Sequence, residues 1–186
     1  RISAQVRKFI DPDTGRYKPE AEMLLLRRKR IIHKAQNKKV AISNLLEELK
    51  ENRKLEYTFV FVPEGYEHDY SDSDSYIIQD DDIHIINEYA EMFKEQGYSY
   101  HQYISGLEDA PSILKSFESG DIQILLSMKC LDEGVDIPRA EYAIFCSSTG
   151  NPRQFVQRRG RVLRKCKGKE KAKIWDLIVM PPDVLD

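Results

Sequence analysis

The sequence predicts an α/β domain with a mostly parallel central sheet and helices on both of its faces. Short apolar segments that are typical of strands alternate with segments of helical periodicity, which is the order of βαβ units. The first strand segment, YTFVFV at residues 57–62, is apolar or β-branched throughout, as in strands whose two faces are both covered. With 186 residues, of which 41% are hydrophobic, the chain is long enough for one large domain.

The N-terminal part of the chain is predicted to contain loop and helix rather than strand. Residues 11–19 (DPDTGRYKP) are rich in turn-forming residues. From residue 20 to residue 50 apolar side chains recur at helical spacing, which predicts one long helix or two in succession. We therefore divide the chain into a helical lead-in segment, residues 1–55, and a main domain, residues 56–186.

The main domain alternates strands with helices. After residues 57–62, the segments predicted to form strands are 98–104, 122–127, 143–146 and 172–179. The segments predicted to form helices are 83–96, a helix capped by Asp109 or Ser112 that runs to Phe117, and 155–164. Glycines at 97 and 120 end the first two of these helices. In parallel sheets of this kind, ligands bind beyond the carboxyl ends of the strands.

Charge is unevenly distributed, although the net charge is only -2. Residues 27–39 and 153–173 are strongly basic, whereas residues 64–82 are strongly acidic, so the blocks cancel in the total. We interpret the acidic stretch, residues 64–82, as a solvated surface insertion in the main domain. The alternative is a docking site for another protein.

Cysteine content and apolar segments argue against several protein classes. Cys130, Cys146 and Cys166 lie far apart and form no C-x-x-C, so neither a disulfide framework nor a metal site is predicted. No apolar segment approaches transmembrane length and no signal peptide is visible, so we expect a cytoplasmic protein without a membrane partner. Because the chain begins with Arg1 rather than Met, we expect it to be a piece of a longer protein.

The segment QFVQRRGRVLR, residues 154–164, concentrates arginines at helical spacing, where like charges repel. On a helix, Gln157, Arg161 and Arg164 share one face, at i, i+4 and i+7. The planar fork of arginine suits phosphate oxygens, so this face predicts a polyphosphate ligand. The residues available for the buried side are Phe155, Val156, Val162 and Leu163.

The same segment contains a glycine, and its arginines have an alternative interpretation. Gly160 would let a ligand or another backbone approach the arginine face closely. The alternative to a phosphate site is a solvated basic face that contacts acidic neighbours, and this would be sufficient for Arg158 and Arg159.

A second segment, LLSMKCLDEGVDIP at residues 125–138, begins as a buried strand and continues into a loop. Gly134 permits a tight turn beside a ligand. Asp136 would accept hydrogen bonds from a ribose hydroxyl, or it would simply cap a turn. Exposed amides of the same loop are suited to a nucleic-acid phosphate backbone.

These segments, together with VFVPEG at residues 60–65, resemble motifs IV, V and VI of superfamily 2 helicases and translocases. Roughly from Phe59 to Pro181, the chain is similar to the C-terminal RecA-like domain of one branch. That branch contains XPB-type DNA repair helicases and the motor subunits of type I and type III restriction enzymes. The resemblance implies a three-layer α/β/α RecA-like domain, and residues 27–49 resemble the segment that commonly precedes motif IV.

The resemblance also implies roles for individual residues. Gln157, Arg161 and Arg164 match motif VI residues that face the γ-phosphate of ATP on another RecA-like domain, with Arg164 or Arg161 as the arginine finger. The residues that match motif V, which links nucleotide to nucleic acid, are Glu133, Gly134 and Asp136.

Candidate nucleic-acid contacts come from loops and strand ends: Ser105, Gly106, Ser127 and Lys129. Each of them is alternatively a plain loop residue. The basic run RRKR at residues 27–30 is a further candidate for contact with phosphates, and the alternative for it is a solvated helix face. Many relatives have Thr where Met128 stands, which puts the hydroxyl contact of motif V in question.

The chain lacks the phosphate-binding motif G-x-x-x-x-G-K-[ST] and a D-E-x-H or D-E-A-D box. The resemblance therefore implies that a missing N-terminal RecA-like domain holds ATP and Mg²⁺, and that this fragment alone is inactive and binds no cofactor tightly. The full-length protein is expected to be an ATP-dependent DNA helicase or translocase, with a repair or restriction role and possible nuclease or other modules as partners. The alternatives are a non-catalytic interaction module and a motor that moves on RNA.

Overall fold

The computed structural model describes residues 2–33, 35–51, 55–63, 80–104, 107–128, 139–147 and 152–180. The chain divides into two compact units, Arg1–Ala35 and Gln36–Asp186. The predictions that fall wholly or partly outside the described residues concern Ser105, Gly106, Lys129, Glu133, Gly134, Asp136 and most of the acidic stretch 64–82.

The first unit is small and largely helical. Its elements are α1 (Ile2–Arg7), a 3-10 turn (Pro19–Ala21) and α2 (Glu22–His33). The turn predicted at residues 11–19 is confirmed, because the Asp11 carboxylate accepts hydrogen bonds from the amides of Asp13 and Thr14 at 3.0 and 2.8 Å. These hydrogen bonds, with the Thr14 hydroxyl, lower the pKa of Asp11.

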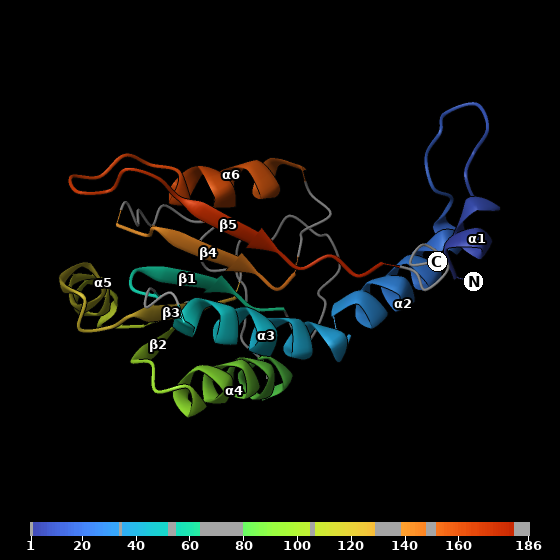
Figure 1. Ribbon diagram of the computed structural model, residues 1–186. Helices are drawn as coiled ribbons and strands as arrows, with labels where there is room; N and C mark the ends of the chain where they lie inside the picture. Colours follow the sequence, from blue (N-terminus) through green and yellow to red (C-terminus); the bar gives the residue numbers. More distant parts are fainter. Residues whose placement is uncertain are drawn as a thin grey trace. The chain divides into compact units, whose positions relative to one another are not determined.

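The second unit contains a five-stranded sheet in the order β2-β3-β1-β4-β5 (Figure 1). The strands are β1 (Thr58–Phe61), β2 (Tyr100–Tyr103), β3 (Ile124–Ser127), β4 (Tyr142–Phe145) and β5 (Lys173–Asp176). Every neighbouring pair is parallel, so the predicted mostly parallel sheet is confirmed. All carboxyl ends of the strands therefore lie at one edge of the sheet and all amino ends at the other.

Helices cover both faces of this sheet (Figure 1). They are α3 (Asn37–Glu51), α4 (Asp80–Glu95), α5 (Ala110–Ser119) and α6 (Pro152–Val162). Alternate residues of a strand point to opposite faces, and Ile124 and Leu125 accordingly enter different core clusters. The first cluster packs α3 and α4 on one face, and the second packs α5 and α6 on the other. The result is the predicted three-layer α/β/α arrangement.

The element boundaries refine several predictions. The helical pattern of residues 20–50 is two helices in succession, α2 and α3. Helix α3 contributes Ile42 and Leu46 to the first core cluster of the second unit. Asp109 is the N-cap residue of α5, but its side chain makes no capping hydrogen bond. Gly120 ends that helix in the left-handed conformation, as predicted, and its amide donates to the carbonyl of Phe117.

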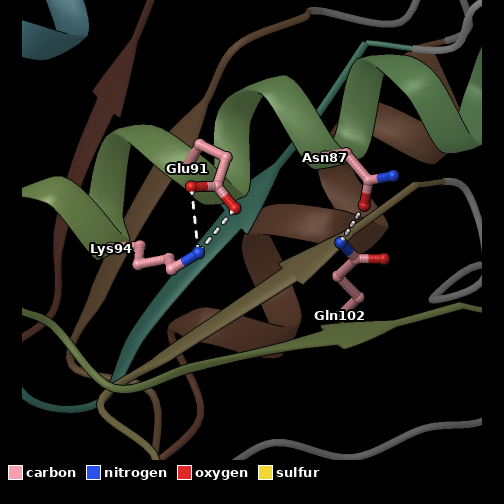
Figure 2. A network of polar contacts seen from close by, with 4 residues as sticks. All are labelled: Asn87, Glu91, Lys94 and Gln102. Carbon is pink, nitrogen blue, oxygen red and sulfur yellow. Dashed lines mark hydrogen bonds and ion pairs between the residues drawn. The ribbon is translucent and has the colours of Figure 1, made fainter.

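A polar contact joins edge strand β2 to helix α4, and a second polar contact lies within α4 (Figure 2). The side-chain amide of Gln102 on β2 donates to the amide oxygen of Asn87 on α4 at 2.6 Å. One turn further along α4, the Lys94 amine bonds both carboxylate oxygens of Glu91, at 3.1 and 3.2 Å. Both contacts are exposed to solvent, so each contributes little to stability, and the Gln102–Asn87 hydrogen bond is the one that joins β2 to α4.

The described residues contain no candidate membrane span and no candidate metal site. None of the helices in these ranges combines the length and apolar character that a membrane span needs. Within the same ranges, no group of three or more His, Cys, Asp or Glu side chains is placed to hold a metal ion.

Candidate functional site

Helix α6, which carries the arginine-rich segment, is attached to the sheet by Arg158. This side chain is only 6% exposed. Its guanidinium carbon lies 5.7 Å from the ring centroid of Phe61. Phe61 in turn stacks on Phe145 of the neighbouring strand, with centroids 4.3 Å apart. The sheet thus presents an aromatic surface to a buried cation, which is a favourable contact for a guanidinium.

Arg159 makes a second attachment on the same side of α6. Its Nη2 lies 2.5 Å from Oδ2 of Asp176, the last residue of β5. The guanidinium carbon also lies 4.9 Å from the ring centroid of Phe145. Both partners of the ion pair are about one-fifth exposed, so the pair is better shielded from water than a surface salt bridge. Contact with an acidic neighbour, one of the two alternatives for this arginine, is therefore observed for Arg159.

The remaining polar residues of the segment lie elsewhere on α6 or beyond it. Gln157 is exposed and Arg161, four residues later on the same helix, is half-buried. Arg164 is exposed, but it follows the last helical residue, Val162, by two positions. The predicted i, i+4, i+7 helical spacing therefore holds for Gln157 and Arg161 and is wrong for Arg164.

The early end of α6 has a clear cause in the loop that follows it. The Lys169 amine folds back and donates to the carbonyls of Val162 and Arg164, the latter at 2.9 Å. It thereby satisfies acceptors that a helix C-terminus leaves without intrahelical donors, and it places a cation at the negative end of the helix dipole. Burial lowers the pKa of Lys169, which nevertheless keeps these two acceptors.

The prediction that Val156 and Leu163 face the core is wrong. These side chains are 66% and 57% exposed, whereas Val162 is 2% exposed. The inner side of α6 carries Val162, together with Arg158 and Arg159, whose guanidiniums lie over the rings of Phe61 and Phe145.

Gly160 lies on the outer side of α6. A methyl group added at Gly160 would meet no atom within 4 Å, so no contact within the described chain requires glycine there.

The carboxyl edge of the sheet is closely packed where it is described. Ser127, a predicted nucleic-acid contact, is 1% exposed at the end of β3, and its carbonyl accepts the Val62 amide at 2.8 Å. Met128 is 3% exposed and belongs to the first core cluster, the one that packs α3 and α4 on the sheet. A contact between Ser127 and nucleic acid stays a prediction, and it would require that this edge opens.

Lys38 is a buried cation that sequence reasoning missed. It lies in the first turn of α3 and is 3% exposed. Its amine has no hydrogen-bond partner among the described residues. Burial lowers the pKa of Lys38, although the charges of Cys146 and Asp176 act in the opposite direction. The sequence did contain a signal for this burial, because Lys38 precedes Ile42 by four residues and Leu45 by seven and so continues the apolar stripe of α3.

Comparison with known proteins places this arrangement in context. Residues 37–166 match the family described as "Helicase conserved C-terminal domain". The chain is 41% identical over 63 residues to the DNA 3'-5' translocase XPB2 of Sulfurisphaera tokodaii, which covers 34% of this chain and 14% of that protein. It is 32% identical over 78 residues to the ATP-dependent DNA helicase MPH1 of Vanderwaltozyma polyspora, which covers 41% of this chain and 8% of that protein.

Solved structures share the fold at low sequence identity. The Pyrococcus furiosus Hef helicase domain has a TM-score of 0.52 at 17% identity, and the match covers 89% of this chain and 30% of that chain. The C-terminal part of the Fun30 ATPase domain has a TM-score of 0.53 at 16% identity, with 74% and 39% covered. The chain spans less than one-fifth of the length of the curated relatives named above.

Proposed function

The chain belongs to the helicase C-terminal domain family, as the C-terminal RecA-like domain of a superfamily 2 helicase or translocase, and from this we propose that it is the second motor domain of an ATP-dependent DNA motor. In this proposal ATP is hydrolysed between this domain and an N-terminal RecA-like domain of the same protein. Closing and reopening that interface would move the motor along a strand.

The observation that carries the proposal is the difference in burial and contacts among the four arginines of residues 154–164. Arg158 and Arg159 are used to attach α6 to the sheet. Arg161, which is half-buried, and the exposed residues Arg164 and Gln157 supply two guanidiniums and a carboxamide on α6 and just past its end. This donor set suits the oxygens of a triphosphate.

Each residue of the donor set has a proposed role at the nucleotide. Arg161 or Arg164 acts as the arginine finger, which stabilises charge on the transferring phosphoryl group and contributes about 10³–10⁵ to the rate in related enzymes. Gln157 orients the γ-phosphate beside them. Mg²⁺, which neutralises phosphate charge when bound, would be held by the other domain, because this chain carries no D-E-x-H or D-E-A-D box.

The nucleic acid is proposed to be DNA, because the two relatives named above are a DNA translocase and a DNA helicase. Ser105, Gly106, Ser127 and Lys129 remain candidate backbone contacts, and Glu133, Gly134 and Asp136 remain the candidate link to the nucleotide. A motor that tolerates any sequence must bind mainly the phosphate backbone, so its affinity is expected to fall with salt.

The proposal is tested by steady-state ATPase of the full-length protein, with and without double-stranded DNA, for wild type, Arg164→Ala and Arg161→Ala. We expect DNA-stimulated turnover that falls at least about a thousandfold in one or both variants, with ATP still bound. Lys115→Ala, an exposed cation on α5, is the control and should turn over as wild type does. Absent turnover, or two unaffected arginine variants, would instead favour a non-catalytic interaction module.

A further inference from the structure

The loop between α6 and β5 carries a second concentration of positive charge. This basic turn, residues 164–173 (RKCKGKEKAK), contains six lysines or arginines and one acidic residue, Glu170. The net charge of the whole chain is -2, so the turn differs strongly in charge from the chain as a whole. None of the functional assignments above uses its lysines.

The backbone of the basic turn is held in place from two sides. From within, the Lys169 amine bonds the carbonyls at the end of α6, and the Lys169 amide bonds the carbonyl of Cys166 at 3.1 Å. From outside, Nη1 of Arg139 donates to the carbonyl of Lys167 at 3.2 Å, while its guanidinium stacks 4.0 Å from the ring centroid of Tyr57. The turn is therefore a braced loop rather than a free one.

Gly168 fits this bracing. Its φ of +84° is a conformation that favours glycine, and a Cβ added there would lie 3.2 Å from Nη1 of Arg139. Both the backbone angle and the close approach of Arg139 thus depend on this residue. Any larger residue at Gly168 would therefore disturb the shape of the turn at its tip.

The lysines that do not brace the turn point their charge outward. Lys165, Lys167 and Lys171 are exposed, and none of them forms an ion pair with another described residue. Like charges held close together on a fixed backbone repel one another, and the repulsion is relieved when a polyanion binds. A solvated loop would carry the same charges without needing the bracing by Lys169 and Arg139.

The basic turn lies at the edge of the sheet opposite the proposed track. It leads into Lys173, which is level with Tyr142 at the amino ends of β5 and β4. Figure 1 shows this loop extending past the start of β5, away from the strand tips. The candidate track residue Ser127, by contrast, ends β3 at the carboxyl edge. A polyanion on the basic turn would therefore contact a different edge of the domain from the track.

We propose that the basic turn is a second DNA-binding surface, which contacts the phosphate backbone of a duplex segment outside the motor track. The inference rests on the DNA motor proposed above. Duplex DNA is the matching polyanion, because it presents a negative charge about every 1.7 Å along its axis. Lysines act as point charges on phosphate, which is suited to binding without sequence preference.

The experiment measures equilibrium binding of the full-length protein, without nucleotide, to a blunt mixed-sequence duplex of about 30 bp at several salt concentrations. The variant Lys165→Gln/Lys167→Gln/Lys171→Gln leaves the bracing residues and Arg164 intact. The matched control, Lys8→Gln/Lys18→Gln/Lys115→Gln, removes the same charge from exposed lysines elsewhere. ATPase turnover at saturating DNA is measured in parallel for both.

We expect the basic-turn variant to lose about tenfold to a hundredfold in affinity at low salt and to reduce the slope of log K against log salt by about 2 to 3. Its turnover at saturating DNA should equal that of the control variant. Equal DNA affinity and slope in the two variants would overturn the inference. Unchanged DNA affinity with lost binding to a polyglutamate peptide would assign the surface to an acidic protein and overturn it too.

The two proposals of this section and the previous one fail in different ways. A wild-type protein whose ATP turnover ignores DNA would overturn the motor, whatever the basic-turn variant does. Lost turnover at saturating DNA in the basic-turn variant, with unchanged affinity, would also contradict the second DNA surface. It would mean that these lysines act through Arg164, their immediate neighbour.

Discussion

The two sides of helix α6 use the same residue type for different purposes. On the inner side, Arg158 and Arg159 are covered by Phe61 and Phe145 and by the carboxylate of Asp176. On the outer side and just past the helix, Arg161 and Arg164 remain half-buried and exposed. The role of a charged residue in a sequence motif therefore does not follow from its residue type alone. Burial distinguishes the arginines that hold the helix on the sheet from those that lie toward solvent.

The largest expected effect would confirm or break the assignment of the outer side. Arg161→Lys and Arg164→Lys keep the positive charge but remove the planar fork that binds two phosphate oxygens at once. If the fork matters, DNA-stimulated kcat of the full-length protein should fall at least about a hundredfold in one of them, while thermal stability stays within the error of wild type. A variant pair with normal kcat would return both arginines to the solvated alternative.

The inner side predicts the opposite pattern for Arg158. Arg158→Ala removes a buried side chain and its contact with Phe61, so we expect a loss of about 2–4 kcal/mol in local stability. Hydrogen exchange of peptides from β4, α6 and β5 in the full-length protein measures this loss. Arg158→Met keeps the apolar stem and should recover part of it. Exchange that matches wild type in both variants would show that Arg158 does not hold the helix.

A third prediction compares Arg158, a buried cation that packs on Phe61, with Lys38, a buried cation whose amine has no hydrogen-bond partner in the described part of the chain. The unfolded-state pKa of Lys38 is near 10.5 and burial lowers its folded-state pKa, so the unfolded chain binds more protons between these two values. Stability should therefore rise with pH through that window. Lys38→Met should remove this rise and stabilise the domain at neutral pH by about 1–2 kcal/mol.

Urea titrations of the full-length protein at neutral and alkaline pH, read by hydrogen exchange of α3 peptides, test the Lys38 prediction. The difference between variant and wild type at each pH cancels the intrinsic pH dependence of exchange. Lys39→Met is a matched control, because Lys39 forms an exposed ion pair with Glu88 at 2.7 Å. A Lys38 variant that is less stable than wild type at neutral pH would mean that the amine contributes a favourable contact.

Much of this fold was predictable, because strands β1, β3 and β4 are short apolar runs that alternate with helical segments. The parallel orientation of the strands and the placement of helices on both faces followed from that alternation and are confirmed. Boundaries were less predictable where distant residues decide them. Helix α6 stops at Val162 because Lys169 folds back onto its carbonyls, and no local pattern announces that contact.

The candidate site was predictable as a motif but not as a geometry. Periodicity assigned Val156 and Leu163 to the core, yet both are exposed, whereas Arg158 faces the sheet with its guanidinium over Phe61. The aromatic surface under Arg158 is assembled from β1 and β4, which are far apart in the sequence and adjacent only in the sheet. Apolar periodicity does not detect a cation that packs on an aromatic ring, so it placed Val162 correctly and Val156 and Leu163 wrongly.

The smallest expected effect concerns Gly160 and the outer side once more. A glycine within a helix costs about 0.5–1 kcal/mol relative to alanine, and an added methyl group meets nothing within 4 Å, so Gly160→Ala should stabilise the domain by about that amount. If another domain or the nucleotide approaches this side closely, the same change should lower kcat severalfold despite the gain in stability. Hydrogen exchange of α6 peptides and steady-state ATPase of the full-length protein measure the two effects together. A variant that gains stability and keeps full turnover would show that nothing approaches α6 at Gly160, and the outer side would then act through its long side chains alone.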